Sequence, residues 1–251
     1  TAAAQAIEND EAMTVDDRLT ALYPQIVLAR LQAASAPAAT TAVTATTATT
    51  ATGAPTDTAA AAPADDAEPA LPPDLVQHVA DRVAWASETV TDKEEMQTVM
   101  GTMIWVLQET GQDAAAEQLL TDKLDATLEP YYYMTELGSM AEDKDDTAGA
   151  LKWYREAWQS AEGSMTRFRW GHSYLRALLR LTPDDEATIE ADATAILTDL
   201  MAKSDALALG NGDRMATLST ALLAWNADGA HDAVVGRLRD LVAATCPGLD
   251  A

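Results

Sequence analysis

Residues 131–163 constrain the fold most, because small and large side chains recur there at distances that suit a pair of packed helices. Gly138 and Ala150 are small where two antiparallel helices would have to cross closely. Tyr154 supplies a large side chain that fills the space beside such a crossing, and Ala157 is small again. This stretch therefore predicts a helix–turn–helix unit with two helices in direct contact.

The spacing is typical of the tetratricopeptide repeat, a helical hairpin of ~34 residues. A shift back by one repeat aligns Ala150 with Ala116, whereas Gly138 falls on Ile104. A shift forward retains neither small residue. We expect one good repeat, a degenerate repeat before it and longer helical hairpins after it, stacked as a short solenoid.

Three regions differ in composition. Residues 1–33 hold a short helical segment that Pro24 interrupts, which predicts a kinked helix or two short helices. Residues 34–73 consist mainly of Ala, Thr and Pro, which favours a disordered linker over an O-glycosylated or partner-binding stalk. Residues 74–247 carry apolar helical stripes and no strand pattern. We therefore predict an all-α chain of tetratricopeptide-like antiparallel hairpins, with a helical-repeat domain over 74–247.

Short local signals predict where several helices begin. Thr91 and Glu94 have the spacing of a capping box. Pro130 suits the first turn of a helix, and the pair Asp145-Asp146 suits the start of the next one. Ser164 is placed to cap the helix after that. These signals divide the repeat domain into short helices joined by turns.

The chain is strongly acidic, with 40 Asp and Glu residues against 16 Lys and Arg and a net charge of −24. This charge opposes binding to nucleic acid and to anionic lipid, so we expect neither as a partner. No run of about 20 apolar residues is present, so the sequence predicts no membrane span. Adaptation to salt and compositional drift both explain such an acidic surface.

Neither a metal site nor a cofactor is expected. Cys246 is the single cysteine of this sequence, so no disulfide, dithiol pair or thiolate zinc cage can form within it. The three histidines, His78, His172 and His231, are far apart in sequence and lack metal-ligand spacing.

One stretch reverses the overall charge. Between Lys152 and Arg180, six basic residues stand against two acidic ones. Nine of the thirteen aromatic residues lie between Tyr131 and Tyr174. Because Arg beside aromatic rings is typical of binding hot spots, we predict a protein-binding surface here. The candidate binding residues are Tyr132, Trp153, Arg167, Arg169, Trp170 and Arg176.

Three other interpretations stay open. In the first, the aromatic residues form the core and the arginines pair with nearby carboxylates. In the second, the chain is an enzyme with a site in the helical groove around His172, which requires a buried carboxylate within hydrogen-bond reach of that imidazole. In the third, the chain is a structural spacer, which a featureless groove would favour.

Several short segments between about 71 and 247 form a pattern of their own: Pro130–Met134, Ala150–Tyr154, Glu162–Gly163, Thr166–Arg167, Trp170–Gly171, Leu181–Asp184, Ile189–Glu190, Leu222–Asn226, Asp228–Gly229 and Cys246. This pattern resembles the helical region that follows the thioredoxin domain in some exported thioredoxin-family proteins of Gram-negative bacteria.

The resemblance implies a non-catalytic helical interaction module, with a protein partner or an associated thioredoxin domain, in a periplasmic or otherwise exported location. Two features depart from the family pattern: the dithiol motif is missing and the Ala/Thr/Pro linker is an addition. No redox role can therefore be carried over to a residue of this chain, and we expect it not to be an enzyme. Because it begins at Thr1 rather than Met, we expect a processed product or a part of a longer protein.

Overall fold

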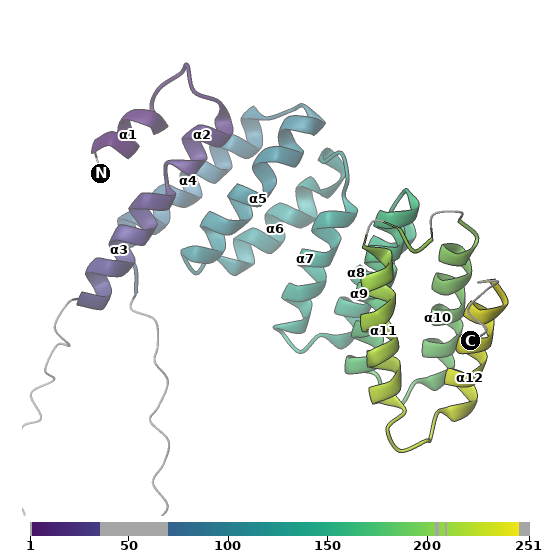
Figure 1. The fold of residues 1–251 in the computed structure, drawn as a ribbon. Coiled ribbons are helices and arrows are strands. Elements are labelled where there is room, and N and C mark those ends of the chain that lie inside the picture. The colour runs from purple at the N-terminus through teal and green to yellow at the C-terminus, as the bar shows by residue number, and fades with distance from the viewer. Residues whose placement is uncertain (1, 36–69, 204–205, 209, 246–251) are drawn as a thin grey trace, which may run out of the picture. The chain divides into compact units, whose positions relative to one another are not determined.

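The computed structural model describes residues 2–35, 70–203, 206–208 and 210–245, and in these residues the only regular elements are helices (Figure 1). The prediction of an all-α chain is confirmed. Most of the predicted linker, like Cys246, lies outside the described residues. The helices are α1 (Ala2–Glu8), α2 (Val15–Thr20), α3 (Tyr23–Ser35), α4 (Pro73–Thr89), α5 (Lys93–Glu109), α6 (Asp113–Lys123), the short 3-10 helix η1 (Leu124–Ala126), α7 (Tyr131–Glu142), α8 (Thr147–Ser160), α9 (Ser164–Leu181), α10 (Glu186–Met201), α11 (Asn211–Trp225) and α12 (Asp232–Thr245).

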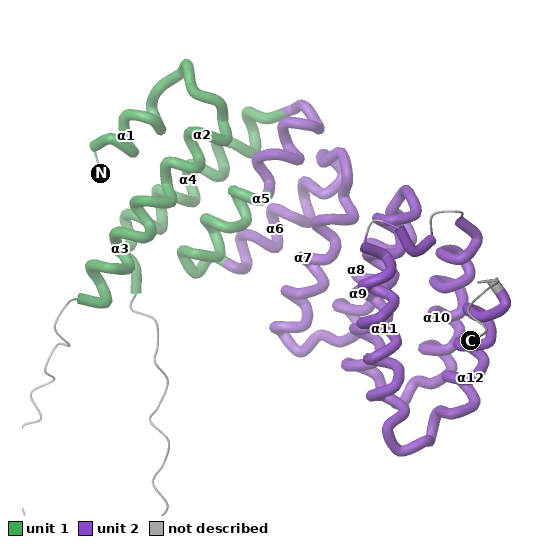
Figure 2. The backbone as a smooth tube through the Cα atoms, in the orientation of Figure 1, with its two compact units in different colours: residues 1–90, 101–112 green, residues 91–100, 113–251 purple. Residues whose placement is uncertain are grey.

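The helices form two compact units (Figure 2). The first unit comprises residues 1–90 and 101–112, and the second comprises 91–100 and 113–251. The segment 1–33 belongs to the same unit as α4, and residues of the predicted domain over 74–247 occur in both units.

In the first unit the amphipathic stretch around Pro24 forms two helices, α2 and α3, one of the two expected outcomes. Pro24 occupies the first turn of α3, where its missing N–H removes no hydrogen bond from the helix. The apolar stripe of the segment is fully buried at Leu19, Leu22 and Ile26. The sequence signals did not predict α1.

Glu8, at the end of α1, holds the first unit together. Its carboxylate is 2% exposed and lies 2.7 Å from His78 Nε2 and 3.6 Å from Arg82 Nε. Gln25 Nε2 donates to the same carboxylate at 2.7 Å, and Arg18 Nε donates to the Glu8 carbonyl at 2.8 Å. Because these partners come from α2, α3 and α4, the carboxylate and carbonyl of one buried residue join four helices.

Aspartate side chains begin two helices of the second unit, and one of these starts, at Asp145-Asp146, was predicted from the sequence. Asp146 accepts from the N–H of Gly149 at 2.9 Å, and Asp185 accepts from the N–H of Thr188 at 3.2 Å. Each carboxylate satisfies a backbone donor that the first turn of a helix leaves free.

Two predicted caps are wrong by one residue. Asp92, rather than Thr91, accepts from the first-turn N–H groups of α5, so no capping box forms there. Gly163 occupies the cap position of α9 with φ of 76°, and Ser164 is the first helical residue. That left-handed backbone conformation favours glycine over serine.

The predicted close crossing of α7 and α8 is confirmed. A Cβ atom at Gly138 would lie 2.6 Å from Tyr154 Cε1, and Ala150 is fully buried. Ser160 lies against Met134 at the far end of the pair, so the two helices run antiparallel. Gly138 and Ala150 thus allow the close contact of α7 and α8 that their spacing predicted.

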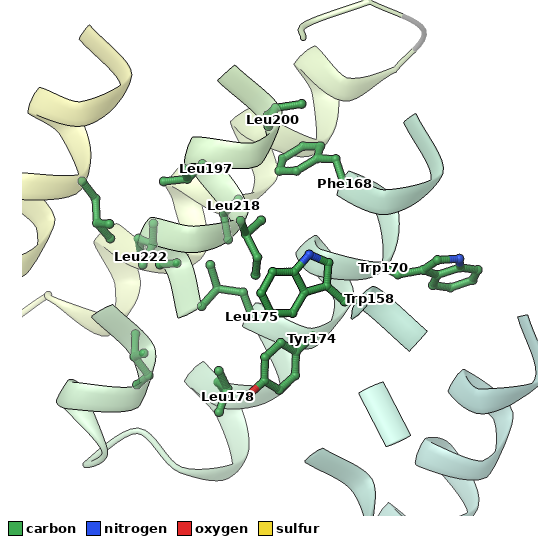
Figure 3. Packing of buried hydrophobic residues seen from close by; sticks show 14 of the residues in the cluster. Trp158, Phe168, Trp170, Tyr174, Leu175, Leu178, Leu197, Leu200, Leu218 and Leu222 are labelled. Atoms are coloured by element: carbon green, nitrogen blue, oxygen red, sulfur yellow. The ribbon is translucent and has the colours of Figure 1, made fainter. Parts of the chain in front are cut away.

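The central helix of the second unit is α9, which packs against α8, α10 and α11, while α12 packs against α10. Trp158 of α8 stacks on Tyr174 of α9 with ring centroids 5.9 Å apart (Figure 3). Gly171 is small where a Cβ would come within 3.0 Å of both Trp158 and Ile196. The aromatic residues of α8 and α9 therefore lie largely in the core.

Candidate functional site

A concave groove of about 770 Å³ opens on the second unit. Most of its lining comes from α9 and α11, with single residues from α7 and α8 and from the turn that follows α9. The lining residues are Thr135, Tyr154, His172, Ser173, Arg176, Ala177, Leu179, Arg180, Pro183, Ala221, Ala224 and Trp225. We call this the basic groove, because its lining includes two arginines and no carboxylate.

The basic groove exists because α9 has two different faces. His172, Arg176 and Arg180 are four residues apart, so they form one stripe along the helix. On the other side of the helix Leu175 and Leu178 are buried in the core. The same helix therefore anchors the unit and presents polar side chains to the groove.

His172 is an uncharged part of the groove wall. Burial, together with the nearby charges of Arg176 and Arg214, lowers the pKa of His172 to about 4. Its Nε2 lies 3.0 Å from Thr217 Oγ1, and that hydroxyl donates to the Arg214 carbonyl at 2.9 Å. Thr217 therefore accepts from His172, which assigns the ring proton to Nε2 and ties α9 to α11.

Arg176 is the uncompensated cation of the groove. Its side chain is exposed, and within the described part of the chain it forms no ion pair. Arg180, in contrast, donates two hydrogen bonds to the Glu142 carboxylate at 2.8 and 2.9 Å. Tyr154 also donates to Glu142, and burial together with this bond raises the pKa of the Tyr154 hydroxyl, which stays protonated.

Trp225 forms a rigid wall of the groove. Its Nε1 donates to the Pro183 carbonyl at 2.8 Å. One face of the indole stacks on the His231 ring, with centroids 3.6 Å apart and an interplanar angle of 6°. His231 is held in turn by Glu186, 2.5 Å from Nδ1. The ring of Trp225 is therefore preorganised for contact with a flat or apolar group.

Of the six predicted binding residues, only Arg176 lines the basic groove. Three others form a separate cluster on α7 and α9: Trp170 meets Tyr132 edge-on at 5.3 Å, and the guanidinium of Arg169 lies 4.6 Å from the Trp170 ring. Trp170 is only 7% exposed, so it mainly packs beneath Tyr132 and Arg169 and offers little surface for a partner.

The other two predicted residues lie elsewhere. Arg167 Nε donates to Asp199 at 2.7 Å, and its Nη1 donates to the Gln159 carbonyl at 2.9 Å, so it caps the end of α8. Trp153 lies on α8 beneath Lys152, whose Nζ is 4.5 Å from the ring centroid. The interpretation in which arginines pair with nearby carboxylates therefore describes Arg167.

Sequence reasoning did not select two prominent groove residues as binding residues. Arg180 had a findable signal, because it continues the four-residue spacing of His172 and Arg176 on one helix. Trp225 had none, because only tertiary packing brings α11 beside α9.

The enzyme interpretation required a buried carboxylate within hydrogen-bond reach of His172. In the described residues the hydrogen-bond partner of this ring is Thr217, and the groove lining holds no Asp or Glu. Nowhere in the described ranges do three His, Cys, Asp or Glu side chains gather as a metal ion would require. The helices that the structure describes include none with the length and apolarity to cross a membrane.

Comparison with models of protein families, with curated proteins and with solved structures finds no match for this chain.

Proposed function

We propose that this chain is a non-catalytic protein-interaction module of tetratricopeptide type, and that its basic groove binds an acidic segment of a partner protein. The observation that carries the proposal is the exposed guanidinium of Arg176, which faces a groove without carboxylates in a chain of net charge −24. An Asp or Glu side chain of a partner would form a charge-assisted hydrogen bond there.

The order of the helices supports the tetratricopeptide part of the proposal. The groove is lined chiefly by the alternate helices α9 and α11, with Thr135 from α7 and Tyr154 from α8, whereas α10 and α12 contribute no lining residue. In a stack of hairpins, the first helix of each hairpin faces one side, and that side offers an extended binding surface. The close contact of Gly138 with Tyr154 is the hairpin crossing that such a stack needs.

The resemblance described above adds a candidate for the partner. The acidic segment would belong to a client protein or to a thioredoxin domain that accompanies this chain in an exported protein. The missing dithiol motif leaves this chain the binding part rather than the catalytic part.

The test uses a fluorescein-labelled peptide that alternates Glu with Leu, and its counterpart with Gln in place of Glu. We expect the Glu peptide to bind more tightly, and added salt to weaken it. Arg176→Ala should weaken binding by ~10–100-fold, because a hydrogen bond to a charged group is worth about 1.5–3 kcal/mol. Fluorescence anisotropy measures both effects.

Arg237→Ala is the matched control. This arginine is exposed on α12, pairs with Glu190 and does not line the groove, so its loss should leave peptide affinity unchanged. Equal binding of the Glu and Gln peptides, or equal affinity of Arg176→Ala and the original chain, would contradict the proposal and leave the spacer interpretation.

A further inference from the structure

A second groove of the same unit is apolar. It has a volume of about 520 Å³, and nine of its eleven lining residues are apolar. Its walls are α11, with Leu218 and Leu222, and α12, with Leu238 and Val242. Figure 3 shows Leu218 and Leu222 beside Leu197 of α10 at the base of this region.

The apolar groove is open because α11 and α12 rest on different neighbours. The main packing of α11 is on α9, and that of α12 is on α10. Leu223, which also lines the groove, is 62% exposed. A large apolar side chain at the rim of an apolar groove gains free energy if another surface covers both.

The charge around this groove is unlike that of the whole chain. Residues 211–245 contain three arginines and four aspartates, in a protein of net charge −24. The lining itself holds Arg239 and no carboxylate. Electrostatic repulsion between two such acidic chains is therefore smaller if they meet at this face than if they meet at a face rich in carboxylates.

We propose that the apolar groove is covered by a second copy of this chain, related by a two-fold axis. Such an axis brings a patch against itself, so the patch must carry both members of each interacting pair. It does: Leu223 is exposed beside an apolar groove, and Arg239 donates to Asp240 of the same copy at 2.9 Å, with side chains 76% and 71% exposed. Each Leu223 packs into the groove of the other copy, and the exposed Arg239–Asp240 pair of each copy lies against that of the other.

The area of this face indicates how stable the dimer is. With 15 and 14 residues, α11 and α12 are each about 21–22 Å long. Two adjacent helices cover a strip roughly 20 Å wide, so the contact buries about 900 Å² over both copies, below the ~1,200 Å² of stable complexes. The dimer is therefore weak and forms only at high protein concentration.

Sedimentation equilibrium of the full chain, from micromolar to near-millimolar concentration, tests the proposal. We expect a monomer–dimer equilibrium whose dimer fraction increases with salt, because salt screens the repulsion between acidic chains and strengthens apolar association. Binding of an acidic segment in the basic groove responds to salt in the opposite direction, so the two proposals fail independently.

Leu223→Asp and Leu223→Lys should both weaken the dimer by about tenfold or more, since each places a charge in the apolar contact. The Lys variant separates this effect from a mere increase in negative charge. Leu128→Asp is the control, because Leu128 is 55% exposed but does not line this groove. A chain that is monomeric throughout, or a dimer that both Leu223 variants leave unchanged while circular dichroism shows intact helices, overturns the proposal.

Discussion

Gly138→Ala tests the close crossing of α7 and α8. The added Cβ would lie 2.6 Å from Tyr154 Cε1 and 2.9 Å from both Cδ1 and Cζ, which is too close for carbon atoms. The ring cannot move away freely, because its hydroxyl is hydrogen-bonded to Glu142 at 2.7 Å. We expect the helices to move apart or the ring to leave its preferred rotamer, and either change destabilises the second unit.

Two opposing effects determine how much Gly138→Ala changes the unfolding free energy. Over-packing costs about 1–3 kcal/mol, whereas replacing a helical glycine by alanine stabilises by about 1 kcal/mol. Gly236→Ala isolates the second effect, since Gly236 lies in α12 with open space around its Cα. The two variants should therefore differ by about 1–3 kcal/mol in unfolding free energy, or roughly 2–12 °C in Tm for a domain of this size.

Urea and thermal unfolding, followed by circular dichroism, measure this difference. In a Tyr154→Ala background the obstructing ring is absent, so Gly138→Ala should then stabilise about as much as Gly236→Ala does. If Gly138→Ala raises the Tm of the original chain as Gly236→Ala does, the argument from close crossing is wrong.

Two further predictions concern buried charge. Burial and the charges of Arg176 and Arg214 lower the pKa of His172 from 6.5 to about 4. Between these two pH values His172 is protonated more readily in the unfolded chain than in the folded one, so the free energy of unfolding falls as the pH drops from 6.5 to 4. His172→Gln should lose less stability from pH 6.5 to pH 4 in urea titrations, and an equal loss in both chains would exclude His172 as the cause. Glu8→Ala leaves Arg82 without its buried partner and should cost the first unit about 3 kcal/mol, whereas Glu11→Ala, at an exposed site, should be neutral. Chemical unfolding compares the two, and equal midpoints would contradict the role assigned to Glu8.

Features that depend on neighbours in sequence could be predicted. The small residue Gly138, the helix start at Asp146 and the interruption at Pro24 each act within one or two turns of helix, and the structure agrees with all three. The caps predicted at Thr91 and Ser164 failed by one residue, because a neighbouring residue suited the cap conformation better.

Features that depend on tertiary packing could not be predicted from the sequence. Arg167 and Arg180 both belong to the basic stretch in which a binding surface was predicted, but their carboxylate partners, Asp199 and Glu142, are 32 and 38 positions away in sequence. Their charges are neutralised by residues that no local pattern connects to them. The basic groove depends in the same way on Trp225 of α11. In sequence α10 separates α11 from α9, so the two helices become neighbours only in the folded structure.

The contact of Glu8 with His78 joins residues 70 positions apart, and residues 36–69 connect the two helical parts of the first unit. The Ala/Thr/Pro composition of this segment predicts a disordered linker, for which the closure entropy grows only with the logarithm of the length, so halving or doubling it should change the closure free energy by about 0.6 kcal/mol. We therefore expect insertions and deletions of Ala, Thr and Pro between α3 and α4 to have little effect on stability. The stability of the first unit should therefore depend little on the length of this segment and strongly on the few side chains that meet around Glu8.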